Sequence, residues 1–259
     1  MHTPRKRFGQ HFLCDQAIIQ QIVFSIAPKP GEHLIEIGPG QGAMTLPILK
    51  IAKQLEAIEL DRDLIPALQE RTHHAGELRV HSADALSFDF ASLKKDERLL
   101  RIIGNLPYNI STPLLFHLLE FAPIVADMLF MLQKEVADRI AALPDTDDYG
   151  RLSVMVQYHC QAEVLFDVPP SAFHPPPKVD SSIIKLIPYH VLPYPADDYK
   201  LFSSIVKLAF GQRRKTLRNS LKGVIDAEKW EKIAVSSILR PEVLSVKEFV
   251  TIANAMSAV

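Results

Sequence analysis

The chain has 259 residues, of which 47% are hydrophobic and 23% charged, and its formal net charge is −1. This composition is typical of a globular protein with one large or two unequal domains, long enough to bury a core without added cross-links. The near-zero net charge excludes a uniformly basic nucleic-acid coat, so local charge clusters carry the information on partners.

Cysteine spacing and the N-terminal residues bear on location. Cys14 and Cys160 lie far apart with no metal-ligand spacing, which is typical of free thiols in a reducing cytosol. The first seven residues include the basic Arg5, Lys6 and Arg7, but no apolar segment follows them, so no signal peptide is expected, and no apolar stretch is long enough to span a bilayer. We expect a cytoplasmic protein with no membrane partner. The histidines have no ligand spacing, and no metal is expected.

Strand-like and helix-like segments alternate over the first two-thirds of the chain. Asp15 is expected to cap a helix that continues to Ala27, and further helices are expected at 44–49, 62–71, 134–143 and 151–160. Another helix is expected to be capped by Ser111 or Thr112, with Pro113 in its first turn. The expected strands are residues 33–37, 55–60, 78–81, 99–104, 128–132, 164–168 and 182–187. Repeated strand–helix units predict an α/β fold with a parallel sheet covered on both faces.

The C-terminal quarter has a different pattern. Residues 188–195 are rich in Pro and Tyr and are typical of a linker, and residues 197–259 have helical periodicity without a convincing strand. We therefore predict two domains, 1–190 with the sheet and 191–259 as a small all-helical domain.

Three strand ends are predicted to form a ligand site. Gly38-x-Gly40-x-x-Ala43 follows the first strand and opens a helix, as nucleotide-binding turns do. Glu59 ends the second strand, where a carboxylate can bind ribose hydroxyls, and Asp84 follows the third strand. Each feature alone also fits a connecting turn or a helix cap. Together they indicate a dinucleotide or S-adenosylmethionine, both of which contain adenosine.

The stretch "GNLPY" after the fourth strand distinguishes between these two ligands. Pro107 cannot donate to a sheet ladder, so the strand stops at Asn105. The Asn105 oxygen and a backbone carbonyl at Leu106 or Pro107 are suited to accept the hydrogens of an adenine amine, while Tyr108 stacks on the base. Hydride transfer has no use for such a clamp, so this stretch favours methyl transfer to adenine from S-adenosylmethionine.

A second aromatic clamp and two basic clusters extend this interpretation. Phe173 lies in a loop with five prolines, where it either packs the loop on the core or stacks on the second face of a flipped base. The first basic cluster is Arg5, Lys6 and Arg7, and the second is Arg213, Arg214, Lys215, Arg218 and Lys222. Their side chains are interpreted as either solvated or in contact with RNA phosphates, and the second cluster is expected on one helix.

These stretches together resemble the KsgA/RsmA family of rRNA adenine dimethyltransferases, over almost the whole chain and in the family's order. The matching blocks are "RKRFGQHFL", "EIGPGQGAMT", "IELDRDL", "GNLPYNISTPLLFHLL", "FMLQKEVADRI", "YGRLSVMVQY", "VPPSAFHPPPKVDSS" and "QRRKTLRNSL". The erythromycin-resistance methylases share the first sheet motifs, but "NLPY", "PPPKVDSS" and "QRRKT" fit the KsgA type better.

The resemblance implies a class I methyltransferase fold with a seven-stranded sheet and a helical C-terminal domain. It implies an enzyme that dimethylates two adjacent adenosines in the 3′-terminal hairpin of 16S rRNA, within the 30S subunit or its late precursor. We expect this enzyme to be a monomer. The donor contacts that it implies are His11, Leu13, Gly38, Glu59, Asp84 and Asn105. Where the family usually has Asn, this chain has His11. The alternatives are a 23S rRNA methylase of the resistance type, a mainly structural assembly factor, and a dehydrogenase.

Overall fold

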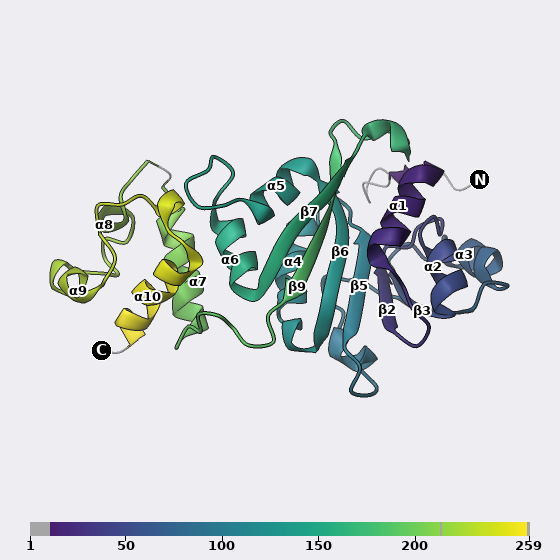
Figure 1. The fold of residues 1–259 in the computed structure, drawn as a ribbon, viewed down its shortest axis with the longest axis horizontal. Coiled ribbons are helices and arrows are strands. Elements are labelled where there is room, and N and C mark those ends of the chain that lie inside the picture. Colours follow the sequence, from purple (N-terminus) through teal and green to yellow (C-terminus); the bar gives the residue numbers. More distant parts are fainter. Residues whose placement is uncertain (1–10, 213, 258–259) are drawn as a thin grey trace. The chain divides into compact units, whose positions relative to one another are not determined.

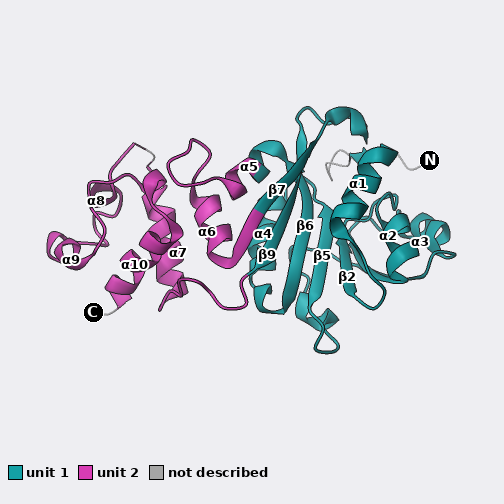
Figure 2. Ribbon diagram, in the orientation of Figure 1, with its two compact units in different colours: residues 1–137, 163–188 teal, residues 138–162, 189–259 magenta. Residues whose placement is uncertain are grey.

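The structure is a computed structural model of the chain, and it describes residues 11–212 and 214–257. These residues form two compact units, coloured separately in Figure 2. The sheet unit holds the described residues up to Ala137 together with Glu163–Pro188, and the helical unit holds Asp138–Ala162 and the described residues from Tyr189 onward. Residues 138–162 belong to the same compact unit as the C-terminal helices. The domain boundary expected at residue 190 therefore stays a proposal.

The sheet unit is built on one large sheet, which Figure 1 shows as a row of strands. Its strands are β2 (His33–Ile37), β3 (Gln54–Glu59), β4 (Glu77–Ser82), β5 (Leu100–Asn105), β6 (Val125–Gln133), β7 (Cys160–Val168) and β9 (Ser181–Pro188). Within the described residues the seven strands have the order β4-β3-β2-β5-β6-β9-β7. The pairs from β4 to β6 are parallel, and β9 runs antiparallel to β6. The predicted α/β fold with a mostly parallel sheet is confirmed.

The helices follow the sequence pattern closely. Those that begin in the sheet unit are α1 (Gln16–Ile26), α2 (Thr45–Ala52), α3 (Ile65–Thr72), α4 (Ser111–Leu119) and α5 (Lys134–Ala141). The Asp15 carboxylate accepts from the backbone N–H groups of Ala17 and Ile18, so the predicted cap of α1 is confirmed. The apolar side of α1 is buried in the core at Ile19, Ile22, Val23 and Ile26.

The predicted side-chain cap of α4 is wrong. The N-cap residue is Ile110, and the helix begins at Ser111 without a side-chain cap. The Ser111 hydroxyl instead donates to the Tyr108 carbonyl at 3.1 Å, so it closes the preceding turn rather than the helix end. Pro113 lies in the first turn, as predicted.

A second, two-stranded sheet ties the N-terminal arm to the Pro-rich loop. β1 (Phe12–Leu13) pairs antiparallel with β8 (Phe173–His174). The N–H groups of Cys14 and Asp15 also donate to the Ala172 carbonyl, at 2.8 and 3.3 Å. These bonds hold segments about 160 residues apart in sequence beside the ends of the parallel strands.

The helical unit contains α6 (Arg151–His159), α7 (Tyr199–Ala209), α8 (Leu217–Ser220), α9 (Ala227–Lys232) and α10 (Val246–Ser257). Helices α7 and α10 pack together, with Phe202, Val206, Phe249 and Ile252 buried on their apolar sides. No strand forms over 197–212 and 214–257, as the periodicity predicts.

Candidate active site at the ends of the parallel strands

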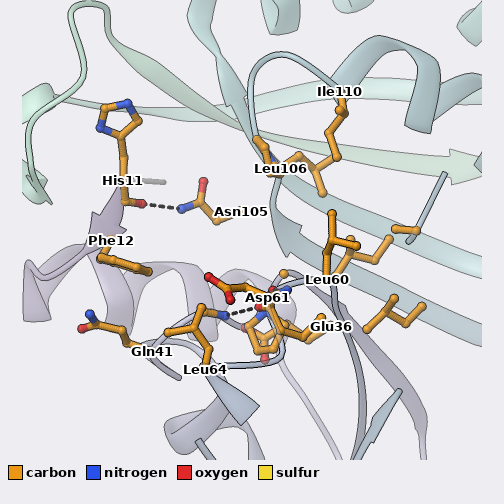
Figure 3. Close-up of a pocket in the computed structure, with 18 of the residues that line it drawn as sticks. His11, Phe12, Glu36, Gln41, Leu60, Asp61, Leu64, Asn105, Leu106 and Ile110 are labelled. Carbon is orange, nitrogen blue, oxygen red and sulfur yellow. Dashed lines mark hydrogen bonds between the residues drawn. The ribbon is translucent and has the colours of Figure 1, made fainter. Parts of the chain in front are cut away.

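The predicted ligand residues meet in one cavity of about 310 Å³ at the carboxyl ends of β2, β3 and β5 (Figure 3). Its walls include the glycine turn after β2, the end of β3, the segment after β4, the turn after β5 and the N-terminal arm. His11, Leu13, Gly38, Glu59, Asp84 and Asn105 all line it, together with Leu106, Pro107 and Tyr108. Open α/β sheets bind ligands at this edge, and the volume is within the range of small-molecule sites.

The glycine turn requires backbone conformations that other residues rarely adopt. Gly40 has φ +55°, and a Cβ there would lie 3.4 Å from the Phe12 ring. Gly42 has φ +81°, and a Cβ there would come within 2.7 Å of the Leu68 side chain. Both positions therefore favour glycine on backbone conformation, and at Gly42 the Leu68 side chain would also have to move. At these glycine positions the turn brings backbone without side chains to the cavity.

Glu59 joins this turn to the end of β3. Its Oε2 accepts from the Gly40 N–H at 3.1 Å, and its Oε1 accepts from the Asp61 N–H at 2.8 Å. The side chain is buried, and burial raises the pKa of Glu59 while these two N–H groups oppose the rise. Each carboxylate oxygen keeps a further lone pair, so Glu59 is a fixed acceptor suited to ribose hydroxyls.

Asp84 lies beyond the end of β4 in the same wall of the cavity. One of its carboxylate oxygens, Oδ1, accepts from the Leu86 N–H at 2.9 Å. This bond fits the connecting-turn role that the sequence also allows for Asp84. It uses one oxygen only, and a carboxylate can accept at both.

Glu36 is a site residue that the sequence reasoning missed. It lies in β2, is 1% exposed, and lines the cavity beside the glycine turn. Burial raises the pKa of Glu36 to about 7, while the Thr45 hydroxyl opposes the rise and the charge of Glu59 adds to it. Among the described residues, its Oε2 atom has no hydrogen-bond partner. An acidic residue between the apolar Ile35 and Ile37 of the strand "HLIEI" is the signal that could have revealed it.

Asn105 ends β5, and its orientation is fixed by the N-terminal arm. Its Nδ2 donates to the His11 carbonyl at 3.3 Å, a bond drawn in Figure 3. Because Nδ2 faces that carbonyl, Oδ1 is the branch of the amide left to accept from a ligand. Of the two further acceptors expected here, the Pro107 carbonyl accepts from the Ile110 N–H at 3.1 Å. The Leu106 carbonyl is therefore the better candidate.

Tyr108 is half-buried at the rim of the same cavity. Its hydroxyl shares a hydrogen bond of 2.8 Å with the Ser181 hydroxyl at the start of β9. Burial raises the pKa of Tyr108, and the bond to Ser181 opposes the rise. The phenol is therefore held neutral, with its ring fixed at one end.

Phe173 does not line the cavity. Its side chain is 4% exposed and belongs to the apolar core, and in the β1–β8 pair it lies opposite Leu13. The second aromatic face expected from Phe173 is thus covered by protein in this structure. The packing role is the one that its contacts support.

The second basic cluster is exposed but does not lie on one helix, so that expectation is wrong. Of the described residues in this cluster, 214–222, only 217–220 are helical, because the N–H groups of Leu217 and Arg218 donate to the carbonyls of Leu239 and Ser237 rather than continuing a helix backwards. Leu217 and Leu221 are buried. Arg214, Lys215, Arg218 and Lys222 are exposed, whereas Arg5, Lys6, Arg7 and Arg213 lie outside the described residues.

Over 11–212 and 214–257, no group of three or more His, Cys, Asp or Glu side chains is placed to hold a metal ion. In the same residues no helix is long and apolar enough to cross a membrane.

The fold and this cavity together are those of Rossmann-like methyltransferases. A dimethyladenosine transferase from Plasmodium falciparum has a similar structure, with a TM-score of 0.80 and 26% identity, over 93% of this chain and 96% of that one. The 23S rRNA methyltransferase ErmE shares the fold, with a TM-score of 0.72 and 24% identity, over 95% of this chain and 99% of that one.

The sequence comparisons define the family. The family model for ribosomal RNA adenine dimethylases matches residues 1–257. The ribosomal RNA small subunit methyltransferase A of Pseudomonas putida is 54% identical over 256 residues, which are 99% of this chain and 96% of that protein. The protein of the same name from Marinomonas sp. is 52% identical over 98% of this chain and 95% of that protein. The chain belongs to the ribosomal RNA adenine dimethylase family and is an rRNA adenine dimethyltransferase, which confirms the resemblance seen in the sequence.

Proposed function

We propose that this enzyme transfers two methyl groups from S-adenosylmethionine to the exocyclic amine of each of two adjacent adenosines. The proposed substrate is the 3′-terminal hairpin of 16S rRNA, in the small (30S) subunit or its late precursor. The observation that carries the proposal is the orientation of Asn105: its amide nitrogen is used by the His11 carbonyl, and its oxygen is left as an acceptor in the cavity of Glu59 and Asp84.

The residues present fit S-adenosylmethionine. Glu59 is a fixed acceptor for ribose hydroxyls, and Asp84 is suited to accept from the adenine amine. The free Oε2 of Glu36 offers a buried acceptor for a cationic amine, such as that of the donor's methionine part. The glycine turn adds backbone contacts without side-chain bulk. When bound, S-adenosylmethionine supplies a methyl group that is already activated as a sulfonium.

The acceptor side has to position a weak nucleophile, since the lone pair of an adenine amine is delocalised into the ring. The Asn105 oxygen and the Leu106 carbonyl accept its two hydrogens, which favours a tetrahedral nitrogen with its lone pair directed at the methyl group. Tyr108 holds the base by stacking, with its hydroxyl tied to Ser181. Positioning of this kind contributes roughly 7–11 kcal/mol. The methylated amine is positively charged and releases one proton to water, so no side chain is required as a general base.

RNA binding is assigned to exposed cations. Arg214, Lys215, Arg218 and Lys222 are exposed in the helical unit and are suited to contact phosphates. Arg5, Lys6, Arg7 and Arg213 are kept as further phosphate contacts on the strength of the sequence. We place this work in the cytoplasm, where small subunits are assembled, and we expect a monomer.

Incubation with labelled S-adenosylmethionine and undermethylated small subunits, followed by mapping of the label, tests the proposal. We expect the label on two neighbouring adenosines near the 3′ end of 16S rRNA, and roughly a hundredfold less label after the same time with an Asn105→Ala control. Label on 23S rRNA instead would support a methylase of the resistance type. If subunit assembly requires the protein but proceeds normally without methylation, a mainly structural assembly factor would be favoured.

A further inference from the structure

Carboxyl groups dominate the charge of the cavity at the ends of the parallel strands. The titratable side chains that line it are those of His11, Glu36, Glu59, Asp61, Asp84 and Tyr108. Within 11–212 and 214–257, no Lys or Arg side chain lines it. Glu36, labelled in Figure 3, is the most deeply buried of the four acids at 1% exposed. Because a buried carboxylate without a cation is costly, the partner that suits Glu36 is a cationic group on the ligand.

Thr45 is the first residue of α2 and lies just after the glycine turn. Its side chain is fully buried, and its Cβ and Oγ1 both lie 3.8 Å from the position that a Cβ on Gly42 would take. Among the described residues, its Oγ1 has no hydrogen-bond partner. Burying a hydroxyl without a partner costs free energy, so we expect this hydroxyl to serve the site rather than the helix.

The unpartnered Oγ1 of Thr45 and the unpartnered Oε2 of Glu36 belong to side chains that interact. Burial raises the pKa of Glu36 to about 7, and the Thr45 hydroxyl opposes that rise while the charge of Glu59 adds to it. A hydroxyl lowers the pKa of a carboxyl group by donating its hydrogen to the ionised form. Because a hydroxyl hydrogen can rotate, Thr45 is able to donate whenever Glu36 loses its proton.

We propose that Thr45 is a positioning residue for the methyl donor: its hydroxyl donates to the Glu36 carboxylate and keeps that group charged to bind the donor's ammonium group. This inference rests on the proposed function, which assigns S-adenosylmethionine to the cavity. Near its pKa of about 7, the free Glu36 carboxyl holds a proton part of the time. Binding of the ammonium group then requires that proton to be released to water, so donor affinity is linked to pH.

The pH dependence of ligand binding tests the role of Thr45. The probe is S-adenosylhomocysteine, the donor without its methyl group, and calorimetry gives its affinity. With a free pKa of about 7 for Glu36, the parent's affinity should fall roughly tenfold from pH 8 to pH 6, as the ionised fraction does. Thr45→Val keeps the shape of the side chain but removes the hydroxyl, which raises the pKa of Glu36 further.

We expect Thr45→Val to bind S-adenosylhomocysteine roughly tenfold more weakly than the parent at pH 6, but less than twofold more weakly at pH 8.5. These factors follow if the hydroxyl changes the pKa of Glu36 by about one unit, as a hydrogen bond to a charged group does. Thr45→Ser retains the hydroxyl and should restore the parent's pH profile. Melting curves at both pH values check that the variants are folded.

Two controls confine the effect to Glu36 and to the amino acid part of the ligand. In a Glu36→Gln background, Thr45→Val should have no further effect, because the carboxylate on which it acts is gone. Any pH dependence that remains there belongs to the other carboxyl groups of the cavity. The second control is 5′-methylthioadenosine, which contains the adenosine but no amino acid part. It should bind the parent and Thr45→Val equally at each pH.

The outcomes separate this inference from the proposed function. A loss in Thr45→Val that is equal at pH 6 and pH 8.5, or that extends to 5′-methylthioadenosine, would reveal a packing role and overturn the inference. If Thr45→Val keeps the parent's pH profile while rRNA adenines are methylated, the proposed function stands and this inference fails. If the pH profiles are as expected but no rRNA adenine is methylated, this inference stands and the proposed function fails.

Discussion

Glu36 and Glu59 end up as two buried carboxyl groups on neighbouring parallel strands, in the wall of one cavity. Their environments differ. Glu59 accepts two backbone N–H bonds, whereas Glu36 keeps an oxygen without a partner among the described residues. Burial, with the charge of Glu59 added to it, raises the pKa of Glu36 from 4.5 to about 7. The site therefore contains one carboxyl group that changes its charge near neutral pH.

The Glu36 carboxyl makes folding stability depend on pH. Its folded pKa is raised above the unfolded value, so its contribution is complete below pH 4.5 and is lost as the pH rises to about 7. We expect Glu36→Gln to be more stable than the parent at pH 8 by up to about 3 kcal/mol, and equal to it near pH 4.5. Urea unfolding between pH 4.5 and 8 measures this difference. The exposed Glu70→Gln is the control, and a Glu36→Gln difference that stays constant with pH would contradict the account.

Loss of the Glu59 carboxylate should weaken donor binding. We expect Glu59→Ala to lower the affinity for S-adenosylmethionine by roughly 1–3 kcal/mol, because a charged acceptor of hydroxyls is removed. Calorimetry gives the affinity, and a melting curve checks the fold, since the Gly40 and Asp61 N–H groups also lose their acceptor. Unchanged affinity in a folded variant would remove Glu59 from the donor site.

Asn105 should act on turnover more than on donor binding. If its oxygen orients the target amine, Asn105→Ala should reduce methyl transfer roughly a hundredfold or more. Some loss of donor affinity is compatible with the account, because the bond to the His11 carbonyl is lost as well. Single-turnover measurements with saturating donor isolate the methyl-transfer step, and near-normal rates there would show that the amide does not orient the acceptor.

The cations of the second basic cluster should set the salt dependence of subunit binding. Replacing Arg213, Arg214 and Lys215 together with Gln should weaken binding and flatten its dependence on salt, because each phosphate contact adds to the slope. Donor affinity should stay the same. Lys232→Gln is a matched control, since Lys232 is exposed in the same unit but lies 3.9 Å from Glu228. An unchanged salt slope in the triple variant would mean that this cluster is a solvated surface.

Local signals in the sequence were enough for much of the fold. Asp15 caps α1 through bonds two and three residues away, and the apolar runs that become strands are read from neighbouring residues alone. The convergence of Gly38, Glu59 and Asp84 was also predictable, because parallel strands place their carboxyl ends on one edge.

Features that depend on distant partners were not predictable in this way. The basic stretch is not one helix, because Leu217 and Arg218 bond to a segment about 20 residues later. Phe173 is buried because β8 pairs with β1, which lies about 160 residues earlier in the sequence. The same pairing brings the ring of His11 beside the ring of Tyr108, which cannot be inferred from either motif alone.

The most direct test of the account is the product formed on the small subunit. Dimethylation requires the monomethyl amine to return to the site with one hydrogen fewer, and stacking on Tyr108 holds the base without that hydrogen. Mass spectrometry of treated small subunits should show N6,N6-dimethyladenosine at two neighbouring positions near the 3′ end of 16S rRNA. Monomethyladenosine should appear only in passing, and Tyr108→Ala should slow both rounds. Monomethyladenosine that accumulates at completion, or methylation of 23S rRNA instead, would contradict the account.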